Sequence, residues 1–532
     1  MTAVQTPILK TISKVLTNPS AAGSSSDGEK PTWRGRRALF VLFTAVTMLY
    51  GAGLGRIDFW APDEPRYGAI AEELRSFRHG ASGLVLLHLN DAPYTQKPPL
   101  YFWLAAAFGA PLGRVDEWAA RLPSALAGLL CVGLTAWIGR RLFHNRTSAI
   151  MAAGMLATSF RFAFTARRAQ LDIVLTAFEL AAIALFLFLE TQRGGIANAR
   201  RFPLAIVALH ACLGAAALTK GPVGWLPMLV FAGYLAWEGR LASLRAITPA
   251  WSWLLSAGPI TAWILAAITL APPGFAKIAV GENLIGRFFS GTSHARPFYY
   301  FAIQLPLDFM PWSLLLPFAI PALWRFSRAT HDQTMKPGAD PDRSAARFLL
   351  SWLIVPLVFF SLSTGKRGLY LLPIFPALAL ACVAIGPSSL RLGRLANKTL
   401  RRLALVLCAV ASIEFALFTL ALPRLNSEKS PRPIALAATR NTAPNEAVGV
   451  FGLSPLEGGI AYYGKRPVIS LRNESDLEAF LDHGGRTIIL RDRKLESLDK
   501  NLGLRAIQTF RSGRRKLALA QRLDPLPRRE GS

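Results

Sequence analysis

Long apolar segments recur along most of this chain of 532 residues. They run from Ala38 to Leu422, and short segments rich in Lys and Arg separate them. Segments of this kind have about the length that a helix needs to cross the hydrocarbon core of a bilayer, and they are too many for a soluble core. Hydrophobic residues make up 52% of the chain and charged residues only 17%. The sequence therefore predicts a polytopic α-helical membrane protein.

The basic segments predict how the helices are oriented, because Lys and Arg stay on the cytoplasmic side. The segment Trp33-Arg-Gly-Arg-Arg37 precedes the first span and places the N-terminus in the cytoplasm. Alternation of basic and weakly basic loops then gives about 11–13 transmembrane helices, with eleven spans assigned and room for two more at proline-broken segments. The short apolar stretch 100–112 is predicted to be a surface or re-entrant helix. The eleven spans are 38–55, 118–142, 149–164, 171–189, 202–218, 223–237, 251–270, 300–324, 348–361, 369–385 and 403–422.

The net charge of +28 does not indicate a nucleic-acid partner, because the basic residues lie in the short loops where they orient helices. The four cysteines all lie inside apolar runs without paired spacing, so they predict neither a disulfide framework nor a metal knuckle. Residues 1–37 lack the apolar core of a signal peptide and are interpreted as a flexible cytoplasmic tail. The cysteines are Cys131, Cys212, Cys382 and Cys408.

Composition changes after the last span, which divides the chain into the tail, a transmembrane domain over 38–423 and a domain over 424–532. An odd number of spans places this last domain in the periplasm. The segments AVGVFG, PVISL and RTIIL predict short strands, and GGIAYYG and SDLEAFLDH predict helices, so a small α/β domain is expected. No glycine-rich phosphate loop stands in the right context, and the glycines here are interpreted as turn residues. These are Gly449, Gly452, Gly458 and Gly459.

The loop over 56–99 carries a density of charge that is rare before residue 320. Asp63 and Glu64 precede Pro65, a pattern that starts a helix, and the helix is predicted over Asp63–Phe77 along the membrane surface. Asp63 and Arg66 then lie one turn apart on one face. Either this is a capped interfacial helix with a solvated ion pair, or it is part of a functional site.

The predicted topology gathers ten polar residues at the outer ends of the spans. Each has a structural explanation by itself, such as a helix cap or an interfacial anchor. Together they offer carboxylates and several cations beside aromatic side chains, which suits a phosphate-linked lipid substrate and a carboxylate that takes a proton from a hydroxyl. They are Asp63, Arg66, Lys97, Asp172, Lys220, His294, Arg296, Lys366, Arg367 and Tyr370.

Six ordered motifs between residues 38 and about 425 resemble a known family, the lipid A 4-amino-4-deoxy-L-arabinose transferases. Those enzymes and the protein O-mannosyltransferases both belong to the C-type membrane glycosyltransferases. The motifs are Asp63-Glu-Pro-Arg66-Tyr67, Gln96-Lys97-Pro-Pro-Leu-Tyr, Trp118-Ala-Ala-Arg-Leu-Pro, Gln170-Leu-Asp172, Leu218-Thr-Lys-Gly-Pro and Lys366-Arg-Gly-Leu-Tyr-Leu-Leu-Pro.

The resemblance implies the fold of that superfamily and an inverting transfer of a sugar from a polyprenyl-phosphate donor. The acceptor would be lipid A, lipopolysaccharide core or protein, on the periplasmic face of the bacterial inner membrane. It implies Asp63 and Asp172 as catalytic residues, and Arg66, Lys97, Tyr370 and Arg296 as donor-phosphate ligands. Glu64, His294, Lys366 and Arg367 are further candidates.

One departure from the family concerns a metal. The aminoarabinose enzymes carry a glutamate beside the first-loop lysine, where it helps to hold zinc with a histidine like His294. Gln96 stands at that position here, and a neutral amide is a poorer ligand than a carboxylate. The sequence thus argues against a divalent metal without excluding one, and it leaves any cofactor unknown.

Two other classes of function are weighed against a glycosyltransferase. A flippase or transporter for lipid-linked sugars would need charged groups along a path through the bilayer, whereas nearly all of them are predicted at span ends. A scaffold protein would leave the ordered motifs unexplained. The donor sugar, the acceptor and the oligomeric state stay open.

Overall fold

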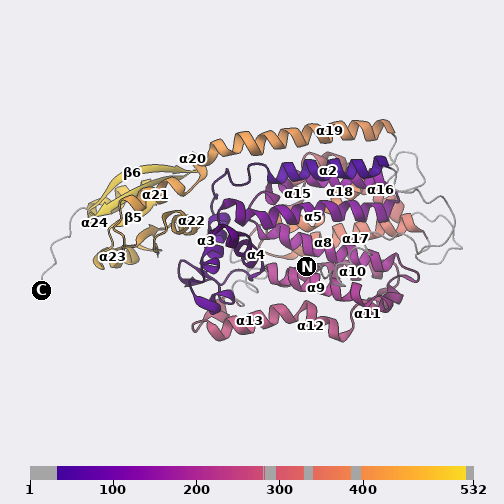
Figure 1. Ribbon diagram of the computed structural model, residues 1–532, viewed down its shortest axis with the longest axis horizontal. Helices are drawn as coiled ribbons and strands as arrows, with labels where there is room; N and C mark the ends of the chain where they lie inside the picture. The colour runs from indigo at the N-terminus through magenta and orange to yellow at the C-terminus, as the bar shows by residue number, and fades with distance from the viewer. Residues whose placement is uncertain are drawn as a thin grey trace, which may run out of the picture.

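The structure is a computed structural model that describes residues 33–278, 281, 295–328, 340–384, 397–513 and 515–522. Most of the predicted tail and His294 lie outside these residues. Figure 1 shows a large bundle of helices with a smaller α/β region at one end of it. The short helix α3 (Asp63–Arg75) and helix α22 (Ser454–Gly464) lie where the two parts meet.

Among the described residues, five helices are long and apolar enough to cross a membrane, or eight if each of three bent pairs is one span. The bent pairs are α6 (Arg146–Ala157) with α7 (Phe160–Ala166) at 69°, residues 250–256 with α13 (Gly258–Leu270) at 52°, and α15 (Tyr300–Asp308) with residues 312–328 at 113°. The five long helices are α5 (Glu117–Phe143), α8 (Leu171–Glu190), α9 (Pro203–Lys220), α17 (Pro341–Leu362) and the segment Lys398–Lys429, which contains α19 (Asn397–Ala416).

The other three predicted spans coincide with shorter apolar helices. They are Arg37–Gly51 within α2 (Trp33–Gly51), Pro222–Trp237, which includes α10 (Leu226–Trp237), and Gly368–Val383, which includes α18 (Phe375–Val383). The predicted surface or re-entrant stretch begins with α4 (Leu100–Gly109). Each of the eleven predicted spans therefore coincides with a helix or a bent pair, and the chain is a multi-pass membrane protein.

Helix α8 is the most buried of the long helices, since 78% of its most apolar stretch of 18 residues is buried inside the protein. By contrast, α19 runs along the outside of the bundle beside α2 (Figure 1). Phe186 of α8 stacks on Phe231 of α10, with 4.1 Å between the ring centroids. Because side chains of α8 are enclosed on most sides, polar groups at its ends are held firmly in place.

The described part of the C-terminal region forms a five-stranded sheet in the order β4-β3-β5-β7-β6. β3 (Val448–Phe451), β4 (Val468–Leu471) and β5 (Thr487–Arg491) coincide with the three predicted strands, and β3 pairs in parallel with the other two. β6 (Leu504–Ser512) and β7 (Arg515–Arg522) add an antiparallel pair that the sequence did not predict. The helices of this region are α21 (Arg432–Arg440), α22, α23 (Glu474–Asp482) and α24 (Asp492–Leu502).

The segment GGIAYYG is helical as predicted, so the interpretation of Gly458 and Gly459 as turn residues is wrong. A Cβ atom at Gly458 would lie 2.7 Å from the Cα of Arg66, and one at Gly459 would lie 2.4 Å from Cγ of Pro431. Such distances are shorter than real side chains tolerate. Gly458 therefore lets α22 approach the backbone of α3 closely, and Gly459 lets α22 approach Pro431, the residue before α21.

Helix α3 itself ends at Arg75, two residues before the predicted end. Phe77 has a φ of 49°, in the left-handed region, and its side chain is 61% exposed. Phe77 continues the helical spacing of Tyr67, Ile70 and Leu74 in the sequence but lies outside the helix. Those three side chains are buried in the core of the protein, whereas the prediction placed this helix along the membrane surface.

Candidate active site

The first turn of α3 presents Asp63 to two guanidinium groups. Its Oδ1 lies 3.9 Å from Nη1 of Arg66, one turn along the same helix, and its Oδ2 lies 3.5 Å from Nη2 of Arg367. The predicted shared face of Asp63 and Arg66 is thus confirmed. The Asp63 side chain is 14% exposed, so it is largely enclosed but still reachable.

Arg66 joins this helix to the next motif, because its Nη1 donates a hydrogen bond of 3.2 Å to Oε1 of Gln96. The amide oxygen that stands in place of the family's metal-binding glutamate is therefore bound to a cation. That arrangement does not fit a metal at Gln96, and no step is assigned to one there.

A second carboxylate is paired in the same region. Asp172, in the first turn of α8, accepts a hydrogen bond from the ammonium of Lys220, the last residue of α9. The ammonium also lies 4.5 Å from the ring centroid of Tyr370. Lys220 therefore links the second acidic residue to the predicted phosphate-binding tyrosine, a role that the sequence did not assign to it.

Lys220 lines a cavity of about 250 Å³. Lys97, Lys220 and Tyr370 line it together with Gln96. The rest of the lining is largely apolar, and this apolar wall comes mostly from α13 and the residues next to it. Its main side chains are Trp225, Ile260, Trp263, Ile264, Phe275 and Phe360.

A neighbouring cavity of about 290 Å³ is mostly cationic. Lys366 is one of its lining residues. The Lys366 ammonium donates hydrogen bonds to the carbonyl oxygen of Ser363 and, at 3.2 Å, to that of Arg296, and these contacts stabilise the loop that carries Lys366. The other charged or polar lining residues are Arg161, Arg296, Tyr300, Gln304 and Arg367. Arg296, predicted to bind the donor phosphate, therefore lies in a different cavity from Lys97 and Tyr370.

Arg367 connects the parts of the site. It lines the cationic cavity and contacts Asp63, although the two residues are 304 positions apart in the chain. Burial alone would lower the pKa of its guanidinium, but the carboxylates of Asp63 and Asp172 outweigh that effect and raise the pKa. Both predicted catalytic carboxylates therefore act on one cation.

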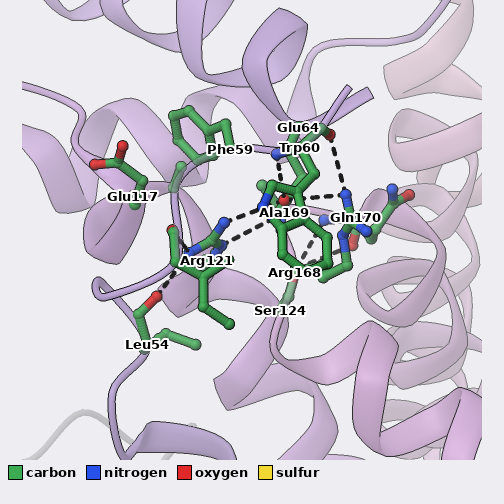
Figure 2. A network of polar contacts seen from close by, with 12 residues as sticks. Leu54, Phe59, Trp60, Glu64, Glu117, Arg121, Ser124, Arg168, Ala169 and Gln170 are labelled. Carbon is green, nitrogen blue, oxygen red and sulfur yellow. Dashed lines mark hydrogen bonds and ion pairs between the residues drawn. The ribbon is translucent and has the colours of Figure 1, made fainter. Parts of the chain in front are cut away.

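Glu64, the neighbour of Asp63, lies in a buried ion network instead (Figure 2). Its Oε1 is 2.8 Å from Nε of Arg121 and accepts a 2.8 Å hydrogen bond from the backbone of Ala169, while Oε2 is 3.0 Å from Nη2 of Arg168. Burial would raise the pKa of this carboxyl, but the two guanidiniums outweigh burial and lower the pKa to about 2. Glu64 thus anchors α3 to the bundle, and Arg121 gives the Trp118–Pro123 motif a structural role.

Comparisons with known proteins bear on this site. The family model described as dolichyl-phosphate-mannose-protein mannosyltransferase matches residues 37–272. An undecaprenyl phosphate-alpha-4-amino-4-deoxy-L-arabinose arabinosyl transferase of Pseudomonas fluorescens is 32% identical over 351 residues, which is 65% of this chain and 59% of that protein. One of Pseudomonas aeruginosa is 29% identical over 396 residues, 71% of this chain and 66% of that protein. The matched region thus spans about three fifths to two thirds of these relatives.

Among solved structures, the crystal structure of ArnT from Cupriavidus metallidurans bound to undecaprenyl phosphate matches with a TM-score of 0.70. Identity is 22%, and the match covers 90% of this chain and 98% of that one. The archaeal oligosaccharyltransferase AglB from Archaeoglobus fulgidus matches with a TM-score of 0.53 at 13% identity, over 88% of this chain and 70% of that one. The chain therefore has the predicted fold of the C-type membrane glycosyltransferases, and in sequence it resembles the aminoarabinose transferases and the protein O-mannosyltransferases.

Proposed function

We propose that this chain is an inverting membrane glycosyltransferase that moves a sugar from a polyprenyl-phosphate donor to an envelope acceptor at the periplasmic face of the bacterial inner membrane. One observation carries the proposal: Arg66 and Arg367 hold the carboxylate of Asp63, and Arg66 also donates to Gln96, which lines a cavity together with two lysines and an apolar wall. Relatives named as undecaprenyl phosphate transferases support this class of donor.

The donor is assigned to the cavity of about 250 Å³. Its phosphate lies at Lys97, Lys220 and Tyr370, and its isoprenoid chain lies against the apolar wall. Negative charge on that phosphate grows as the sugar leaves, so nearby ammonium groups stabilise the transition state more than the ground state. Asp172 keeps the Lys220 ammonium in position for this role.

In the transfer step an acceptor oxygen forms a bond to the anomeric carbon on the face opposite the phosphate. The bond from that carbon to the phosphate oxygen breaks, and its electron pair leaves with the polyprenyl phosphate. If the acceptor is a hydroxyl, Asp63 takes its proton. If the acceptor is an ionised phosphate, no base is needed, and Asp63 serves by holding Arg66 and Arg367.

The acceptor is assigned to the cationic cavity of about 290 Å³, which Arg367 connects to Asp63. Guanidinium groups bind phosphate in a bidentate fashion, and Arg161, Arg296 and Arg367 all line this cavity. A phosphorylated lipid A or lipopolysaccharide core suits this lining better than the neutral hydroxyl of a protein side chain.

A flippase for lipid-linked sugars is the alternative function. It requires charged groups across the bilayer, whereas most of the charged side chains of this site gather at one end of the bundle. Glu179 is a charged residue within α8 that would suit such a path. Its side chain is buried, and its Oε1 has no hydrogen-bond partner among the described residues, so the alternative needs a test.

Mass spectrometry of the cell envelope tests the proposal. Lipid A, lipopolysaccharide core and envelope glycoproteins are compared between cells with and without the gene. Deletion should remove the mass of one sugar from one acceptor, and wild type should restore it while Asp63→Asn does not. Asp58→Asn is a matched control in the same loop, since Asp58 pairs with Arg432 instead, and it should restore the mass. Unchanged envelope masses after deletion would contradict the proposal.

A further inference from the structure

Two carboxylates and an imidazole converge beyond the end of α3 that is opposite Asp63. Glu73 lies in the last turn of α3, His79 follows the helix, and Asp91 lies in the turn between strands β1 (His88–Leu89) and β2 (Ala92–Pro93). Nε2 of His79 lies 3.2 Å from Oε2 of Glu73 and 3.5 Å from Oδ1 of Asp91. One atom from each of the three residues lies within 4.8 Å of the others.

The two separations from Nε2 of His79 are those of ligands around a small cation. Zinc bonds of roughly 2.0 to 2.2 Å in a tetrahedral arrangement place neighbouring ligand atoms about 3.4 Å apart. A neutral imidazole has at most one hydrogen to donate from Nε2, so it forms a good hydrogen bond with only one of two carboxylates. A divalent cation would satisfy all three groups at once.

Groups outside the cluster fix each ligand. The second oxygen of Glu73 accepts a 2.6 Å hydrogen bond from the backbone of Asn90, and the second oxygen of Asp91 lies 2.7 Å from Nη2 of Arg78. The ring of His79 stacks on that of His88 with 3.8 Å between centroids. Supporting contacts of this kind are what orient metal ligands in proteins.

The turn that carries Asp91 is equally well defined. Asn90 and Asp91 have φ angles of 55° and 64°, as in a two-residue hairpin turn that favours Asn and Asp. Exposure rises from 11% for the Glu73 side chain through 20% for His79 to 46% for Asp91. The cluster therefore has a closed side on α3 and an open side at the hairpin, where a metal could enter and a water could complete the shell.

We propose that Glu73, His79 and Asp91 form a binding site for a divalent transition metal, with Zn²⁺ the best match to one nitrogen and two carboxylate ligands. The site is separate from Gln96 and takes no part in the transfer step proposed above. Its role is structural, because it joins α3 to the β1–β2 hairpin.

The hairpin in turn touches the C-terminal sheet. Oδ1 of Asn90 accepts a 3.0 Å hydrogen bond from the backbone of Val468 in the edge strand β4, and Nδ2 of Asn90 donates to the carbonyl oxygen of the same residue. A metal at Glu73, His79 and Asp91 thus ties α3, the hairpin and the C-terminal domain together.

Zinc binding to the purified full-length protein in detergent tests this proposal. After treatment with a chelator, Zn²⁺ is titrated by calorimetry, and thermal unfolding is followed with Zn²⁺ or Mg²⁺ added. We expect one Zn²⁺ per chain, an increase in Tm with Zn²⁺ and none with Mg²⁺. His79→Ala should weaken Zn²⁺ binding at least tenfold and abolish the increase in Tm.

Control variants locate the metal. Asp91→Asn changes the most exposed ligand and should weaken binding while the protein stays folded. His483→Ala, at an exposed histidine of the C-terminal region, and Gln96→Ala should bind Zn²⁺ like wild type. Co²⁺ substitution should give a tetrahedral spectrum without thiolate bands, which separates this site from the cysteines. Equal Zn²⁺ affinity in wild type, His79→Ala and Asp91→Asn, or no binding at all, would overturn the proposal.

Discussion

Glu64 shows how much of this site depends on one buried charge. Glu64→Gln keeps the shape of the side chain but leaves the guanidiniums of Arg121 and Arg168 without a counter-charge. Breaking a buried ion pair from one side costs about 3 to 5 kcal/mol, so we expect the free energy of unfolding to fall by about that amount. Denaturant unfolding in detergent measures it, with the exposed Glu474→Gln as control. Equal stability of the two variants would contradict an anchoring role.

The same residue predicts a dependence of stability on pH. The pKa of Glu64 is about 2 in the folded protein, below its ordinary value of 4.5. A carboxyl whose pKa is lowered by folding stabilises the fold above its unfolded pKa, and this contribution is lost as pH falls toward the folded pKa. The difference in unfolding free energy between wild type and Glu64→Gln should therefore shrink between about pH 4.5 and pH 2. A difference that stays constant over this range would contradict the ion network.

Lys97 and Tyr370 test the assignment of the donor cavity. A charge-assisted contact is worth about 1.5 to 3 kcal/mol and a neutral hydroxyl about 0.5 to 1.5, so Lys97→Ala should lower kcat/KM more than Tyr370→Phe. Lys97→Arg should rescue activity only in part, because a planar guanidinium does not replace a compact ammonium. Transfer from a polyprenyl-phosphate donor by purified enzyme measures these effects. Unchanged turnover and donor affinity in Lys97→Ala would make Lys97 an interfacial anchor only.

At the scale of elements, the packing of α22 on α3 bears on catalysis. Gly458→Ala would put a methyl group 2.7 Å from the Cα of Arg66, so one of the two helices must shift. A displacement of about 1 Å in a catalytic group can cost roughly 100-fold in rate, and we expect kcat to fall at least tenfold while donor affinity changes less. Gly458 is thus a positioning residue.

A matched glycine controls for the substitution itself. A Cβ at Gly51, the last residue of α2, would meet nothing within 4 Å, so Gly51→Ala should keep full activity. If Gly458→Ala and Gly51→Ala turn over the donor equally, the close contact between α22 and α3 does not position the site.

The elements that the sequence predicted well are those fixed by local patterns. Apolar runs bounded by basic clusters marked the candidate spans among the described residues, and the start of α3 at Asp63 follows from acidic residues before a proline. Its end at Arg75 depends on the left-handed backbone of Phe77, which no periodicity reveals. Strand β6 was missed because its residues are mostly exposed and carry no alternating pattern. Strand β7 was missed because its buried apolar stretch, 517–520, is only four residues long.

At the scale of the whole molecule, the fold brings distant motifs together. The sequence could predict that the polar residues lie at one side of the membrane, but not which of them pair. Asp172 with Lys220, Asp63 with Arg367 and Glu64 with Arg121 are contacts between separate helices or loops, and each depends on tertiary packing. The sequence likewise could not predict the two separate cavities, the one of about 250 Å³ with lysines and an apolar wall and the cationic one of about 290 Å³, because their lining residues come from many helices and loops.

The most direct test separates transfer from transport. Purified protein is reconstituted in liposomes with a polyprenyl-phosphate sugar labelled in the sugar and with a lipid A acceptor. Wild type should release free polyprenyl phosphate and place the label on the acceptor, whereas Asp63→Asn should still bind the donor but lose transfer by at least 100-fold. A labelled donor that only moves between leaflets intact, or equal transfer by wild type and Asp63→Asn, would contradict a glycosyltransferase centred on Asp63.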